Sequence, residues 1–309
     1  MKRIRKYLLT LMMIVFGLFI LSGCTSSDDY KLKISSPSGA PLVAIAGALD
    51  NDKQELSLNL EAQALQPLFV NNEMDFIVAP INLGATLYSK NANYKLAAVL
   101  TWGNLFFASK NADFDNVEDI NGKELVLFGE NTINDVVCSY VLNNFNVTPV
   151  TKTYLGSTQL TQQGLLSDDG GKVYLVAEPA ISAAKFKDAT IKTISVQDLF
   201  YTASSGKKFA QAGLFVNKNT LVNHEMLAKN FIKKVSESVA LVKTEPDALA
   251  DKAISFGIST PKAVLVSSFE GCNISFVKAK DAKTDVEYTA NLDLTKFGGS
   301  VPNDEFYYE

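Results

Sequence analysis

The sequence predicts an α/β protein in which strands and helices alternate along the chain. Short apolar runs recur that are apolar on both faces, as strands buried between helix layers must be, and segments of helical periodicity separate them. The 309 residues are 47% hydrophobic and 20% charged, an ordinary globular composition with room for about two domains. We therefore expect mostly parallel sheets, covered by helices and arranged in two lobes.

The first 23 residues have the pattern of a secretory signal peptide. A basic segment, residues 2–6, precedes an apolar run at 7–20 that is shorter than the roughly 20 residues of a membrane span. The sequence Leu-Ser-Gly-Cys at 21–24 resembles the bacterial lipobox, which implies that Cys24 is lipidated and becomes the first mature residue. The alternative is an uncleaved N-terminal anchor. Residues 24–30 are predicted to be a short polar tether.

Cleavage before Cys24 would change the charge of the chain. It removes four of the 29 basic residues and none of the 33 acidic ones, so the net charge falls from −4 to −8. Arg3 and Arg5, the only arginines, are lost with the signal peptide. The remaining chain has no basic surface suited to nucleic acid and no arginine to clamp an anionic ligand.

Histidine and cysteine are scarce. One histidine and three cysteines are too few for a zinc cluster, and any catalytic triad would depend on His224, which we expect on the surface or at a helix cap. Cys138 and Cys272 are predicted to be buried free thiols, and a disulfide between them is the alternative.

The helices and strands of residues 31–309 are predicted from apolar runs and from the Gly and Pro residues that bound them. The predicted strands are 31–35, 56–60, 75–79, 95–100, 104–109, 124–128, 173–177 and 212–216. The predicted helices are 41–49, 63–71, 82–90, 132–144, 157–167, 179–186, 223–244, 246–256 and 281–291. Pro246 and Pro261 lie where new helices would begin. Two sheet-forming regions followed by a helical region indicate two lobes.

Several segments carry a family resemblance when taken in chain order. They are 35–41 (SSPSGAP), 72–83 (NEMDFIVAPINL), 101–104 (TWGN), 119–129 (DINGKELVLFG), 178–180 (EPA) and the C-terminal Gly298-Gly299 with Pro302 and an aromatic run at 306–308. This ordered set resembles the type II periplasmic-binding-protein-like substrate-binding proteins of ABC importers. The closest group is the one that binds nitrate, sulfonates, taurine and thiamine-pyrimidine precursors.

The resemblance implies two lobes joined by two hinge-crossing strands, for which 104–109 and 212–216 are the candidates. Lobe 1 would contain 31–105 and 216–309, and lobe 2 would contain 106–215. Ligands of open α/β sheets bind beyond the carboxyl ends of the strands, which places the ligand between the lobes.

The first group of candidate ligand-binding residues follows strands of the predicted first lobe. Ser36, Ser38 and Gly39 lie in a loop that enters a helix, where backbone N–H groups and hydroxyls could face a ligand. Asn82 follows the third strand and can both donate and accept hydrogen bonds. Trp102 precedes a predicted crossing strand and could stack on a flat ligand or hold a cation over its face. The alternatives are helix capping for the loop and Asn82, and core packing for Trp102.

The second group belongs to the predicted second lobe. Gly129, Asn131 and Thr132 form a similar strand-to-helix turn, with an ordinary cap as the alternative. Glu178 follows an apolar strand and could accept a hydrogen bond from a ligand or cap the next helix. Two such edges facing each other would make a binding site without arginine.

The resemblance implies a lipid-anchored, exported solute-binding protein on the outer face of a bacterial cytoplasmic membrane. It would be a monomer without catalytic residues, metal or cofactor, and it would deliver its ligand to an ABC permease and ATPase. The ligand would be a sulfonate-type anion or a neutral or cationic heteroaromatic molecule, and the net charge favours the latter weakly. The alternatives are a surface adhesin or sensor accessory with the same fold, and an enzyme resembling the fungal thiamine-pyrimidine synthases. Those enzymes consume an active-site histidine, whereas His224 lies far from every loop above.

Overall fold

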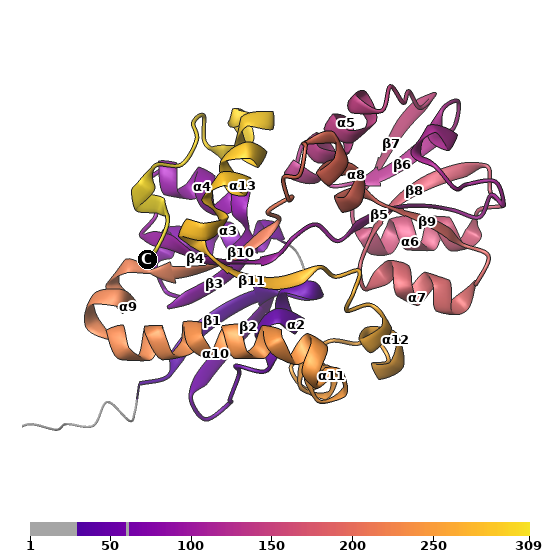
Figure 1. Cartoon of the computed structure of the whole chain (residues 1–309). Coiled ribbons are helices and arrows are strands. Elements are labelled where there is room, and N and C mark those ends of the chain that lie inside the picture. The colour runs from indigo at the N-terminus through magenta and orange to yellow at the C-terminus, as the bar shows by residue number, and fades with distance from the viewer. Residues whose placement is uncertain (1–29, 60–61) are drawn as a thin grey trace, which may run out of the picture. The chain divides into compact units, whose positions relative to one another are not determined.

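The computed structural model describes residues 30–59 and 62–309, so the predicted signal peptide and Cys24 lie outside the described residues. The segment Leu32–Glu309 forms one compact unit. Its strands form two sheets, each flanked by helices, which confirms the predicted α/β class (Figure 1). Across the described residues, no helix combines the length and apolar character needed to cross a membrane.

The first sheet has six strands in the order β11-β4-β10-β3-β1-β2. Their bounds are β1 Leu32–Pro37, β2 Gln54–Asn59, β3 Phe76–Pro80, β4 Tyr94–Thr101, β10 Ala212–Asn217 and β11 Ile274–Lys278. Strand β1 runs parallel to β2 and β3, whereas β10 runs antiparallel to β3 and β4.

Helices cover both faces of the first sheet. Alternate residues of β3 divide between two apolar clusters, with Ile77 and Ala79 in one and Phe76 and Val78 in the other, as the pleat of a strand requires. Helices α2 (Ala40–Ala46), α10 (Glu225–Thr244) and α11 (Pro246–Ser255) pack on the second cluster, and α3 (Gln66–Asn71), α4 (Ile81–Ser89) and α13 (Ala279–Leu292) on the first. The remaining helical elements of this lobe are η1 Ala62–Leu65, α9 Lys218–Asn223, α12 Lys262–Ser267, η3 Leu294–Phe297 and η4 Asp304–Phe306.

The second sheet has five strands in the order β7-β6-β8-β5-β9. Their bounds are β5 Leu105–Ser109, β6 Glu124–Phe128, β7 Thr151–Leu155, β8 Lys172–Ala177 and β9 Lys192–Ser195. Helices α5 (Ile133–Asn144) and α8 (Val196–Ala203) pack on one face, and α6 (Thr158–Ser167) and α7 (Ala180–Lys187) on the other. A short helix, η2 Val117–Ile120, precedes β6.

The chain passes from the first sheet to the second at residues 102–104 and returns at 204–211. The predicted crossing strands, β5 and β10, each lie within one sheet. Residues 212–215, which we assigned to lobe 2, therefore pair with β3 in the first sheet. A single apolar cluster continues through the crossings by way of Trp102, Leu105 and Phe209. The lobe bounds, taken as domains, remain a prediction.

The expectation of mostly parallel sheets was wrong. Strands β5 and β10 follow the two crossings, and each runs antiparallel to both of its neighbours. The predicted set of strands also lacked β7, β9 and β11. All three lie at sheet edges and carry exposed polar residues, so they lack the apolar faces by which the buried strands were recognised.

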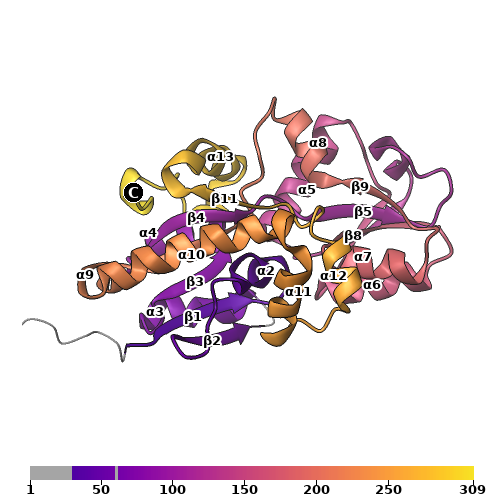
Figure 2. The same ribbon diagram turned by 60° about the horizontal axis from the view of Figure 1, so that its bottom comes forward.

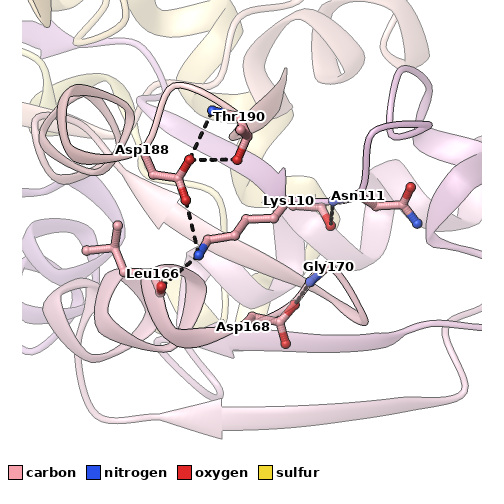
Figure 3. A network of polar contacts seen from close by, with 8 residues as sticks. Lys110, Asn111, Leu166, Asp168, Gly170, Asp188 and Thr190 are labelled. Carbon is pink, nitrogen blue, oxygen red and sulfur yellow. Dashed lines mark hydrogen bonds and ion pairs between the residues drawn. The ribbon is translucent and has the colours of Figure 1, made fainter.

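A polar network connects the segments at the carboxyl end of β5 in the second sheet (Figure 3). The Lys110 ammonium lies 3.1 Å from the Asp188 carboxylate and donates to the Leu166 carbonyl oxygen at 2.7 Å. Asp188 also accepts from Thr190, and these bonds hold its pKa at about 2. Because β5 and β8 are antiparallel, the carboxyl end of β5 lies beside the amino end of β8. The network is therefore at the opposite end of these strands from Glu178, which follows the carboxyl end of β8.

Candidate functional site

The carboxyl ends of β1 and β3 bring four predicted residues, Ser36, Ser38, Gly39 and Asn82, to one edge of the first sheet. Ser35 pairs with Ile77 in parallel register, so the segments after both strands emerge side by side. Ser36 is buried, and its hydroxyl donates to the Pro37 carbonyl oxygen at 2.9 Å. Gly39 precedes α2 with φ of +89°, a region that residues with a Cβ rarely adopt.

Asn82 lies in the first turn of α4, directly after β3. The preceding residue, Ile81, donates its backbone N–H to the carbonyl oxygen of Gln211 at 3.0 Å, which ties the start of α4 to the second crossing. Asn82 Oδ1 is buried and has no hydrogen-bond partner among the described residues. This oxygen therefore has lone pairs that no described residue uses.

The second sheet presents a matching edge. Val126 pairs with Tyr174 in parallel register, so the turn after β6 and Glu178 after β8 lie next to each other. Gly129 has φ of +76° and Asn131, which is exposed, has φ of +57°. The Thr132 hydroxyl donates to the Gly129 carbonyl oxygen at 2.6 Å. Thr132 is the N-cap residue of α5, but its side chain accepts no capping hydrogen bond.

Glu178 is the buried carboxyl group of this edge, with 8% of the residue exposed. Ser182 of α7 donates to it from its hydroxyl at 2.8 Å and from its backbone N–H at 3.2 Å. Burial raises the pKa of Glu178 to about 7, although the Ser182 bonds and the Lys185 charge act in the opposite direction. The carboxyl group therefore changes charge near neutral pH.

The two edges approach each other closely. A Cβ atom at Gly39 would lie 3.8 Å from Cδ of Pro179, the residue after Glu178. A Cβ atom at Gly271, which follows α12, would lie 2.7 Å from Oε1 of Glu178. Figure 2 shows α12 beside α7, where this loop of the first lobe meets the second lobe. We define the inter-lobe site as the predicted residues of these two edges together with Asn104. They are Ser36, Ser38, Gly39 and Asn82 of the first lobe and Gly129, Asn131, Thr132 and Glu178 of the second.

Asn104 was absent from the predicted site residues, although it ends the TWGN segment that carried part of the resemblance. It lies in the first crossing and is only 7% exposed. Its backbone carbonyl oxygen accepts from the Glu178 N–H, and its backbone N–H donates to Gln211 Oε1. Its side-chain Nδ2 donates to the Glu178 carbonyl oxygen at 3.2 Å. Asn104 Oδ1 is buried without a partner among the described residues.

Trp102 lies apart from the other predicted residues in its contacts. It is 5% exposed, and its ring N–H donates to the Ser275 carbonyl oxygen at 3.0 Å, with the Lys208 ammonium 5.7 Å from the ring centre. It lines a cavity of about 710 Å³. The other lining residues include Tyr201, Phe269, Glu270 and Asn273, and none of the other predicted ligand-binding residues. These contacts agree with core packing at the hinge, and a ligand-binding role for Trp102 stays a prediction.

The remaining titratable candidates lie outside the inter-lobe site. His224 joins α9 to α10, at the cap position that the sequence predicted. Cys138 and Cys272 are both free and buried, as predicted, and burial raises the pKa of each thiol. Over residues 30–59 and 62–309, no three His, Cys, Asp or Glu side chains are grouped to hold a metal ion.

Comparison with solved structures supports the fold. An ABC transporter protein from Parabacteroides distasonis has a TM-score of 0.78 and 23% identity, over 91% of this chain and 99% of that one. The ligand-binding component of an ABC-type import system from Staphylococcus aureus, solved with zinc bound, gives 0.69 and 15%, over 90% and 96%. The periplasmic aliphatic sulphonate-binding protein SsuA from Escherichia coli gives 0.64 and 14%, over 86% and 87%.

No family model matches the sequence, and no curated protein matches it either. The structural likeness nevertheless spans nearly the whole of the described chain and of each neighbour. It confirms that this protein has the two-lobed fold of the type II periplasmic binding proteins, as the sequence resemblance implied.

Proposed function

We propose that the protein is an exported solute-binding protein that captures a small molecule between its lobes and delivers it to the permease of an ABC importer. It is anchored through a lipid on Cys24 to the outer face of the cytoplasmic membrane and performs no chemistry on its ligand. We further propose that the protein is a monomer and that it contacts the permease and ATPase only while it delivers its ligand.

The observation that carries this proposal is the meeting of two polar sheet edges at Gly39 and Pro179. Each edge consists of a turn between a strand and a helix, and each lies at the carboxyl ends of parallel strands, where open α/β sheets bind ligands. The solved neighbours, whose descriptions name ABC-type import and sulphonate binding, support the transport role. Short crossings of the kind at 102–104 and 204–211 allow hinge closure around a ligand.

Native mass spectrometry of the gently purified protein tests the proposal. We expect an additional mass of small-molecule size that is lost on collisional activation. As a matched control, a protein unfolded in denaturant and refolded should show the bare mass and recover the additional mass from a concentrated cell extract. A bare mass in both preparations, with no uptake from the extract, would contradict solute capture.

A further inference from the structure

We infer that the inter-lobe site recognises a solute that donates hydrogen bonds, a cationic or neutral N–H compound such as an amine or amidine, and that it discriminates against sulfonates and other oxyanions. This inference rests on the proposed function and specifies its substrate class. It follows from which atoms of the site are already used in hydrogen bonds and which are not.

The orientation of the Asn104 amide is fixed by its neighbours. Nδ2 donates to the Glu178 carbonyl oxygen at 3.2 Å, and exchanging the two amide atoms would place oxygen against oxygen. The atom left without a partner among the described residues is therefore an acceptor, Oδ1. A buried acceptor without a donor is costly, and few occur in folded proteins.

Asn82 supplies a second buried amide oxygen without a partner. Its Oδ1 is also buried without a partner in the described part of the chain. Gln211 connects the two segments, because it accepts from the backbone N–H of Ile81, the residue before Asn82, with its carbonyl oxygen and from the backbone N–H of Asn104 with Oε1. Unmatched oxygens on both asparagines are suited to a ligand that has more than one N–H group.

Two hydroxyl groups of the site also present oxygen lone pairs. A hydroxyl has one proton, and both Ser36 and Thr132 spend it on a nearby carbonyl oxygen, Pro37 and Gly129 respectively. The Glu178 carboxyl group adds a further acceptor, which is negatively charged for part of the time near neutral pH. A sulfonate would have to bind against this set of oxygens, and residues 30–309 contain no arginine to clamp it.

The test uses two probes that share a phenyl ring and carry opposite charges, benzamidine and benzenesulfonate, titrated by calorimetry into protein stripped of co-purified solute. We expect benzamidine to bind at least about tenfold more tightly, the difference expected of one charge-assisted hydrogen bond. Asn82→Leu should weaken benzamidine by a similar factor. Asn82→Asp keeps the acceptor, adds a negative charge, and should tighten benzamidine while weakening benzenesulfonate further.

Asn144→Asp is the matched control, because it makes the same change on the exposed surface of α5, where the Asn144 side chain bonds only its own helix. It should leave both affinities unchanged. Tighter binding of benzenesulfonate would overturn the inference and leave the proposed function intact. Equal binding, or no binding of either probe, would also overturn it, and the proposed function would still be judged by the co-purified solute. The comparison of probes on the unmodified protein requires no variant to fold.

Discussion

Replacing Glu178 by glutamine is predicted to remove a specific pH dependence from the stability of the protein. Glutamine has the shape of the protonated carboxyl group and can keep both contacts with Ser182. The pKa of Glu178 is about 7 in the folded protein and near 4.5 for an ordinary glutamate, because the folded site buries the charge. The folded state therefore holds this proton more tightly than the unfolded state does.

The sign and size of the effect follow from this difference. Stability is greatest while both states are protonated, below about pH 4.5. It falls as the pH rises towards 7 and is then constant. At about 1.4 kcal/mol for each tenfold change in proton affinity, the buried carboxyl group costs on the order of 3 kcal/mol above pH 7. Glu178→Gln should match the unmodified protein at pH 4.5 and be more stable at pH 8 by up to this amount.

Urea unfolding, followed by the fluorescence of the only tryptophan, Trp102, measures this effect. The free energy of unfolding should be compared at several values between pH 4.5 and 8. Glu270→Gln is the control, because Glu270 is an exposed carboxylate in the loop that reaches Glu178, and it should leave the pH profile unchanged. Parallel profiles for the unmodified protein and Glu178→Gln would refute the reasoning about burial.

Three further predictions concern other parts of the account. Cys24→Ala should move the protein from the membrane fraction to the soluble fraction without changing its melting temperature, and unchanged retention would contradict the lipid anchor. Gly271→Ala should weaken solute binding several-fold, since its Cβ would lie within 3 Å of Glu178 Oε1, and unchanged affinity in calorimetry would show that the lobes do not need this close approach. Trp102→Ala should lower the free energy of unfolding by about 3–5 kcal/mol, as for other buried aromatic residues. A loss below 1 kcal/mol, with weakened solute binding, would return Trp102 to a ligand-binding role.

The sequence was informative wherever burial imposed a pattern. The central strand β6 was predicted with its correct bounds and β8 within one residue, because both are covered by helices and read as apolar runs. The edge strands β7 and β9 were not predicted, since one-sided exposure leaves no such run. The antiparallel direction of the strands after the crossings depends on how the chain turns in space, which a strand pattern does not encode.

The same limit applies to the inter-lobe site. Strand-to-helix turns identified Gly39 and Thr132, because the residues that form them are local in the sequence. Asn104 was not predicted as a site residue because its hydrogen bonds with Glu178 and Gln211 join segments that are far apart in the sequence. Trp102 was selected for its ring chemistry, whereas its contacts with Ser275 and Lys208 come from segments far along the chain.

Hydrogen–deuterium exchange with and without the co-purified solute tests the central claim most directly. If the solute binds between the lobes, it should slow exchange in segments of both lobes together, at 36–43, 81–84, 129–136 and 178–183. The segments that line the cavity beside Trp102, 197–201 and 266–275, should change less except where Gly271 meets Glu178. Protection confined to one lobe, or confined to the cavity beside Trp102, would contradict capture between the two sheet edges.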